Sequence, residues 1–111
     1  MFYIKKKLEI SASHQVFTEN GTKCENLHGH NFIIYVFCKN KELNNDGMVI
    51  DFIKIKELIH KRLDHKNFND VFDFNPTSEN IAKWIVDTVP FCYKAIVQES
   101  SNNEVIYEKD E

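Results

Sequence analysis

The stretch "CENLHGH", residues 24–30, places one cysteine and two histidines within seven residues. Neutral imidazole and thiolate are preferred zinc ligands in proteins, and a thiolate can also act as a base or nucleophile. His28 and His30 are two residues apart at the start of an expected strand, so their side chains point to the same face. Taken alone, the pair indicates either a metal site or two histidines that pack or face solvent.

A third histidine favours the metal site. His14 follows an expected strand over residues 2–12, on the parity of Ile10 and Ala12. If the two strands form an antiparallel hairpin, the end of the first meets the start of the second, and the imidazoles of His14, His28 and His30 converge. Three imidazoles without a fourth protein ligand form a catalytic zinc site with an open position.

Cys24 has three interpretations. It is a fourth zinc ligand, a small buried hydrophobic residue, or a reactive thiolate whose pKa a nearby zinc ion lowers. The sequence pattern alone does not rank the ligand against the base.

Asp64 and His65 end the first expected helix. Neighbouring side chains do not face each other on a helix, but at a helix end both can point into a cleft. The alternative is a polar helix terminus at which the helix dipole favours His65.

Glu99 closes an expected strand and shares the parity of Tyr93, Ala95 and Val97, which we expect to be buried. A carboxylate on an apolar face needs a partner. The alternative is that the strand ends there and Glu99 reaches water.

The elements that position these residues follow from hydrophobic periodicity. Alternation and β-branched or aromatic residues predict strands, and a 3.6-residue period predicts helices, the second of which has Thr77 and Ser78 as N-cap candidates. The order ββααββ predicts an α+β fold: a four-stranded antiparallel sheet with both helices on one face. The expected strands cover residues 2–12, 30–39, 92–99 and 104–108, and the expected helices cover 49–64 and 77–89.

Composition narrows the class of protein. A chain of 111 residues with 42% hydrophobic residues is expected to form one domain, residues 1–111. Its net charge of -3 provides no basic surface for nucleic acid or an anionic membrane. We identify no signal peptide and no apolar run long enough for a transmembrane helix. Three cysteines without paired spacing favour a reduced, cytoplasmic location.

Six blocks, in order along almost the whole chain, resemble the 6-pyruvoyl-tetrahydropterin synthase family, and most closely its bacterial 6-carboxy-tetrahydropterin synthase branch. They are "SASH" (11–14), "CENLHGHNF" (24–32), "GMVIDF" (47–52), "LDHKNFND" (63–70), "NPTSENIAKWI" (75–85) and "VQES" (97–100).

The resemblance implies the tunnelling fold (T-fold), in which sheets from three subunits close into a barrel and two trimers stack into a homohexamer. It also implies a role for each matching residue. The zinc ligands are His14, His28 and His30; the catalytic residues are Cys24, Asp64 and His65; Glu99 binds the pterin; and Thr77, Ser78 and Glu79 line its pocket.

The resemblance further implies a zinc-dependent lyase acting on 7,8-dihydroneopterin triphosphate. In the bacterial branch the products are 6-carboxy-5,6,7,8-tetrahydropterin, acetaldehyde and triphosphate, in queuosine (7-deazaguanine) biosynthesis. One alternative is a 6-pyruvoyl-tetrahydropterin synthase, which eliminates triphosphate but keeps the side chain. The other is a non-enzymatic zinc-binding module with a closed site of three histidines and one cysteine.

Overall fold

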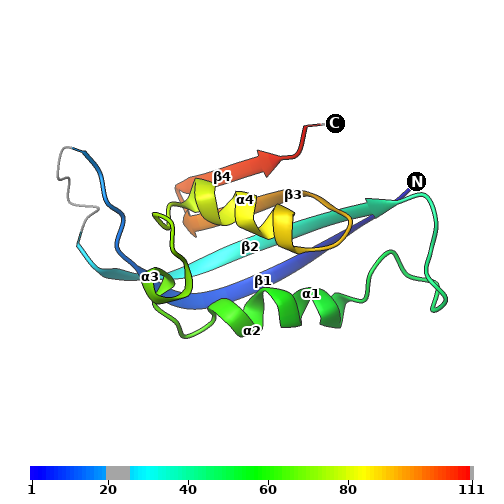
Figure 1. The fold of residues 1–111 in the computed structure, drawn as a ribbon, viewed down its shortest axis with the longest axis horizontal. Coiled ribbons are helices and arrows are strands. Elements are labelled where there is room, and N and C mark those ends of the chain that lie inside the picture. Colours follow the sequence, from blue (N-terminus) through cyan, green and yellow to red (C-terminus); the bar gives the residue numbers. More distant parts are fainter. Residues whose placement is uncertain (20–25, 111) are drawn as a thin grey trace.

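The computed structural model describes residues 1–19 and 26–110 and contains one antiparallel sheet with the strand order β1-β2-β3-β4 (Figure 1). All four expected strands are present, each close to its expected bounds. They are β1 (Phe2–His14), β2 (His28–Asn40), β3 (Cys92–Ser100) and β4 (Asn103–Glu108).

The helices lie on one face of this sheet, as expected from the element order. The first expected helix is divided into α1 (Phe52–Leu58) and α2 (His60–Leu63), with a break at Ile59, whose φ is -112°. A short helix, α3 (Phe68–Val71), was not predicted, because four residues are too few to show a helical period. The second expected helix is α4 (Ser78–Thr88), capped by Thr77. Figure 1 shows α1 and α2 along β1, and α4 over β3 and β4. Within the described ranges, no helix is long and apolar enough to cross a membrane.

The core lies between the helices and alternate residues of the strands. On β1 and β2 the residues facing the helices are almost fully buried, whereas the intervening residues are half-buried or exposed. This alternation is the expected pattern for a sheet covered on one face. The same face of the sheet continues to the end of β1 and the start of β2, where it carries histidines instead of apolar residues. The core therefore extends directly into the candidate site.

A β-bulge changes one sequence-based expectation. The register between β2 and β3 shifts after Phe37, so that Cys92 occupies the buried face although its parity differs from that of Ala95 and Val97. Tyr93 is consequently turned to the opposite face, where its ring centroid lies 6.3 Å from that of Phe37. The expected burial of Tyr93 was wrong because the extra residue of a bulge reverses strand parity; that of Ala95 and Val97 was correct.

Candidate metal centre and active site

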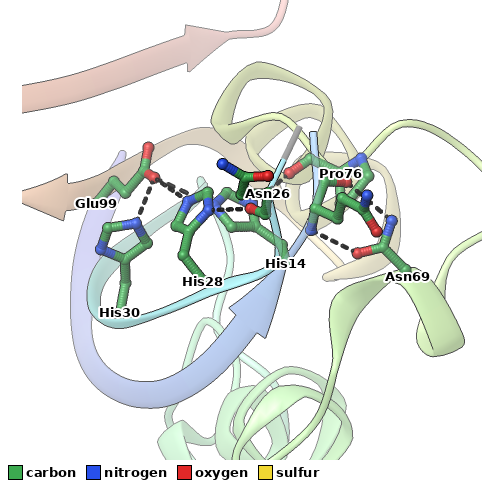
Figure 2. Close-up of polar contacts among 8 residues, drawn as sticks. His14, Asn26, His28, His30, Asn69, Pro76 and Glu99 are labelled. Carbon is green, nitrogen blue, oxygen red and sulfur yellow. Dashed lines mark hydrogen bonds and ion pairs between the residues drawn. The ribbon is translucent and has the colours of Figure 1, made fainter. Parts of the chain in front are cut away.

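Three histidine side chains converge where β1 ends and β2 begins. In the antiparallel register His14 pairs with His28, and Ala12 pairs with His30, so all three imidazoles project from the helix-covered face of the sheet. Glu99, near the end of β3, completes the group. Its Oε1 lies 2.8 Å from Nε2 of His30, 3.1 Å from Nε2 of His14 and 3.4 Å from Nε2 of His28 (Figure 2).

Backbone carbonyls fix the orientation of two of these rings. Nδ1 of His14 donates to the carbonyl of Pro76 at 2.8 Å, and Nδ1 of His28 donates to the carbonyl of Asn26 at 2.7 Å (Figure 2). Since a carbonyl only accepts, each Nδ1 carries a proton, and each neutral ring keeps its lone pair on Nε2. Metal-binding histidines are commonly oriented by a backbone or carboxylate acceptor in this way.

The electrostatics of the group fit a cation. Nitrogen lone pairs and a carboxylate oxygen repel one another unless positive charge lies among them, either as ring protons or as a metal ion. In addition, Nε2 of His30 is buried and, despite its short distance to Glu99, has no aligned hydrogen-bond partner among residues 1–19 and 26–110. One ligand atom from each of the four residues lies within 4.8 Å of the others. This arrangement is compatible with a bound metal ion.

Burial and neighbouring charge shift the pKa of two members of the cluster. Burial lowers the pKa of His30; the charge of Glu99 opposes this shift, and the charges of His28 and His14 add to it. Burial raises the pKa of Glu99, but the hydrogen bond and charge of His14, together with His30 and His28, outweigh this effect and leave it below its usual value. The lowered pKa of His30 favours its neutral imidazole, and the lowered pKa of Glu99 favours its ionised carboxylate, and these are the forms that coordinate metals. The shift of Glu99 depends on positive charge at the imidazoles, which a bound cation would replace.

Aromatic packing holds the most buried histidine in place. The side chain of His14 is 1% exposed, and its ring centroid lies 5.3 Å from that of Phe32 and 6.2 Å from that of Phe68. Phe32 belongs to β2 and Phe68 to α3, so the sheet and the helical layer both restrict the imidazole. A ligand fixed by packing loses little conformational entropy on binding.

A cavity of about 180 Å³ adjoins the histidine cluster. Ser78, which is 7% exposed, lines it, and its Oγ has no hydrogen-bond partner in the described part of the chain. A buried hydroxyl without a protein partner is uncommon, so Oγ of Ser78 is available to a water molecule or to a polar atom of a ligand. The cavity is lined by His14, Val16, His28, Thr77, Ser78, Glu79, Glu99, Asn103 and Val105, and so contains all four residues expected to contact the pterin.

Asp64 and His65 lie together, but at the outer edge of β1 and outside the set of described residues that line this cavity. Oδ1 of Asp64 accepts from the backbone N–H of Ser11 at 2.9 Å, and the N–H of His65 donates to the carbonyl of Ser11 at 2.7 Å. Nε2 of His65 is 3.4 Å from Oδ2 of Asp64. This contact is possible because α2 has ended and His65 adopts a left-handed φ of 57°. The side chain of His65 is 82% exposed.

Cys24 lies outside the described residues, so its position relative to the three histidines is not part of this geometry. Among the described residues, two features of the site were not obtained from the sequence. The contact of Glu99 with all three histidines was not expected, because strand parity gives a face but not the direction of a long side chain. The carbonyls of Pro76 and Asn26 carry no sequence signal at all.

Comparisons with known proteins agree with this geometry. The model of the family described as 6-pyruvoyl tetrahydropterin synthase matches residues 3–110. The 6-carboxy-5,6,7,8-tetrahydropterin synthase of Bacillus subtilis is 30% identical over 123 residues, which cover 96% of this chain and 84% of that protein. The dihydroneopterin monophosphate aldolase of Pyrococcus furiosus is 38% identical over 86 residues, which cover 75% and 70%. The structure of Caenorhabditis elegans 6-pyruvoyl tetrahydropterin synthase has a TM-score of 0.76 at 24% identity, covering 98% and 96%.

The sheet, the helices on one face and the structural similarity define a tunnelling-fold protein. More particularly, the chain belongs to the 6-pyruvoyl tetrahydropterin synthase family. Members of this family are lyases and metalloenzymes, so the protein is an enzyme of pterin chemistry.

The grouping of His14, His28, His30 and Glu99 predicts that replacing His28 with alanine removes a metal ligand. We expect a sharp fall in bound metal when the purified variant is incubated with Zn²⁺, desalted and analysed by atomic emission, because two imidazoles rarely hold zinc against dilution. His60→Ala is the matched control, since His60 lies beside Asp64 and outside the cluster. Wild-type metal content in the His28 variant would contradict the assignment.

Proposed function

We propose that the protein is a zinc-dependent 6-carboxy-tetrahydropterin synthase, which converts 7,8-dihydroneopterin triphosphate to 6-carboxy-5,6,7,8-tetrahydropterin, acetaldehyde and triphosphate. The observation that carries the proposal is the convergence of three imidazole Nε2 atoms beside a cavity that contains Glu99 and the unpartnered hydroxyl of Ser78. The activity would serve queuosine (7-deazaguanine) biosynthesis in the cytoplasm.

His14, His28 and His30 would hold the zinc ion. Three imidazoles leave room for a substrate atom at the metal, whereas four protein ligands close a zinc site. When bound, zinc supplies Lewis-acid polarisation of a substrate oxygen. The hydrogen bonds of the two Nδ1 atoms to backbone carbonyls keep the rings in the ligating tautomer throughout a turnover.

Glu99 would recognise the pterin ring. The pyrimidine edge of a pterin presents adjacent N–H donors, and an ionised carboxylate accepts two such bonds in parallel. Thr77, Ser78 and Glu79 would complete the pocket, with Oγ of Ser78 available for a polar atom of the ring. Although burial raises the pKa of Glu99, the neighbouring histidines hold it below its usual value, so Glu99 is ionised at neutral pH, as this role requires.

Cys24, Asp64 and His65 would transfer protons. A thiolate near a cation has a depressed pKa and acts as a base, and a histidine oriented by a carboxylate can accept and return its proton. Oδ1 of Asp64 is fixed by the backbone of Ser11, which leaves Oδ2 to orient His65.

The short connection in "CENLHGH" favours the carboxy-forming branch. Three residues separate Cys24 from His28, a spacing that resembles the bacterial enzymes, whereas the pyruvoyl-forming enzymes resemble it less and have a longer connection. The similarity to the Bacillus subtilis protein supports the same branch. The alternative reaction is that of a 6-pyruvoyl-tetrahydropterin synthase, which eliminates triphosphate without cleaving the side chain.

The active site would be shared between subunits of a hexamer. A cavity of about 180 Å³ is smaller than the roughly 300–1,000 Å³ of typical small-molecule sites, which supports further walls from a neighbouring chain. The strands β1 and β4 are the two edges of the sheet, and edge strands invite pairing. If β4 of one copy pairs with β1 of the next, Asp64 and His65 of the second copy come to the end of β4 at which Asn103 lines the cavity.

Product analysis tests the reaction. We expect the metal-loaded protein, supplied with 7,8-dihydroneopterin triphosphate, to release triphosphate and acetaldehyde, trapped as a hydrazone, in equal amounts. Triphosphate without acetaldehyde, together with a pterin that keeps its three-carbon side chain, would assign the pyruvoyl branch. Absence of any pterin conversion would reject the function.

Glu99→Gln separates pterin recognition from metal binding. The amide keeps the shape but loses charge and one acceptor, so we expect KM to rise at least about tenfold, as loss of a charge-assisted hydrogen bond predicts, with metal content unchanged. Glu104→Gln, an exposed carboxylate on β4, is the control. Loss of metal from the Glu99→Gln variant would show that Glu99 is a fourth metal ligand. An unchanged KM would exclude Glu99 as the pterin-binding carboxylate.

Subunit mixing tests the shared site. Glu99→Gln and His65→Ala chains, each impaired alone, should regain about one quarter of wild-type activity when co-expressed in equal amounts, because random assortment completes that share of sites. If verified mixed oligomers recover no activity, Glu99 and His65 act in a site formed by a single chain. If light scattering shows that the active protein is a monomer, the hexamer is excluded.

A further inference from the structure

Two asparagine side chains hold the segment that leaves β1. The N–H of Gln15 donates to Oδ1 of Asn69 at 2.7 Å, and Nδ2 of Asn69 donates to the carbonyl of Gln15 at 2.9 Å (Figure 2 shows the Asn69 side). In the same manner, the N–H of Phe17 donates to Oδ1 of Asn75 at 2.9 Å, and Nδ2 of Asn75 donates to the carbonyl of Phe17 at 2.8 Å.

Each amide reproduces the two hydrogen bonds that a residue of a neighbouring strand would make. A carboxamide carries both an acceptor and donors, so it can bind both backbone groups of one residue. The clamped residues are two apart, the spacing at which an extended chain presents its backbone groups to the same side. Gln15 and Phe17 are therefore held extended beyond the last ladder pair of β1, at His14.

The two asparagines are themselves fixed by helix starts. The N–H of Asn69 donates to the side chain of Asn67, the N-cap of α3, at 3.1 Å. The carbonyl of Asn75 accepts from the N–H of Thr77 at 2.8 Å and from Nδ2 of Asn80 at 2.9 Å, both at the start of α4. The pair thus connects the helical layer to the segment that follows β1, and we call it the asparagine clamp.

The residue between the two clamped positions is Val16, which lines the cavity beside His14. Of the nine described residues that line the cavity, only Val16 and Val105 are aliphatic. A flat heterocycle that offers its polar edge to Glu99 also needs apolar contact for its faces, because small-molecule sites gain most of their affinity from such contact. Backbone hydrogen bonds on both sides of Val16 leave its side chain little freedom to turn away.

We propose that Asn69 and Asn75 are positioning residues that hold Val16 as an apolar wall of the substrate cavity, and that Val16 sets how well the pterin ring fits. The inference rests on the proposed function, because it takes the ligand of the cavity to be a pterin.

The test uses Asn69→Asp and Asn75→Asp, each of which keeps the acceptor and the size but replaces the donor by an oxygen that faces a backbone carbonyl. We expect the dissociation constant for neopterin, measured by fluorescence titration of the zinc-loaded protein, to rise at least about fivefold in each variant, with metal content unchanged. Val16→Ala should raise it in the same way without removing a hydrogen bond.

Asn44→Asp is the matched control. Its Oδ1 accepts from the N–H groups of Asp46 and Met48, so an aspartate keeps both bonds, and Asn44 lies in the turn that precedes α1. We expect its neopterin affinity to equal that of the wild type. Affinities within twofold of wild type in both clamp variants, with only a lower melting temperature, would reduce the clamp to a support of the fold and overturn the proposal.

Amide exchange separates failure of the clamp from failure of the proposed function. Asn69→Ala removes the acceptor too and should speed exchange at Gln15, and Asn75→Ala should speed it at Phe17, whatever ligand the protein binds. If wild-type protein binds no neopterin and converts no pterin, the proposed function and the assigned ligand both fail. Unaltered amide exchange at Gln15 and Phe17 in the alanine variants would show that the two asparagines do not hold this segment.

Discussion

The backbone pairing of His14 with His28 across β1 and β2 determines what the site can do. Antiparallel pairing puts directly opposed side chains on one face, and the two-residue spacing of His28 and His30 adds the third imidazole to that face. A register slip of one residue would send the histidines to the opposite face and expose the core. Because residues such as Ile10 and Phe32 must stay buried, the packing of the core also fixes the geometry of the histidine cluster.

The helical layer contributes orientation more than ligands. Its connections supply the Pro76 carbonyl to His14, the Ser78 hydroxyl to the cavity and the asparagine clamp to the segment after β1. Each of these groups lies at or just before a helix start, where side chains and carbonyls are not used by the helix ladder itself. The sheet thus provides the reactive groups, and the helix starts keep them in one orientation.

The sequence predicts the structure best where periodicity is long and side-chain direction is simple. These features are the four strands, the helix-covered face of the sheet and the face shared by His14, His28 and His30. Sequence-based prediction failed at Tyr93, because one bulge residue reverses parity, and at α3, because a four-residue helix has no measurable period. It could not show that Glu99 turns towards the imidazoles, since the direction of a flexible carboxylate depends on its tertiary neighbours. Nor could it bring Asp64 and His65 into contact, which requires a left-handed residue.

In the proposed metal centre, nitrogen from three imidazoles, and no sulfur, would bind the metal ion, which would leave Cys24 free to act as a base. X-ray absorption at the zinc edge of the zinc-loaded protein distinguishes the possible ligands, because zinc–nitrogen and zinc–oxygen distances of about 2.0–2.1 Å are resolved from zinc–sulfur distances of about 2.3 Å. We expect a first shell of three imidazole nitrogens and one further light atom. A sulfur ligand near 2.3 Å would close the site with Cys24 and contradict the proposed catalytic centre.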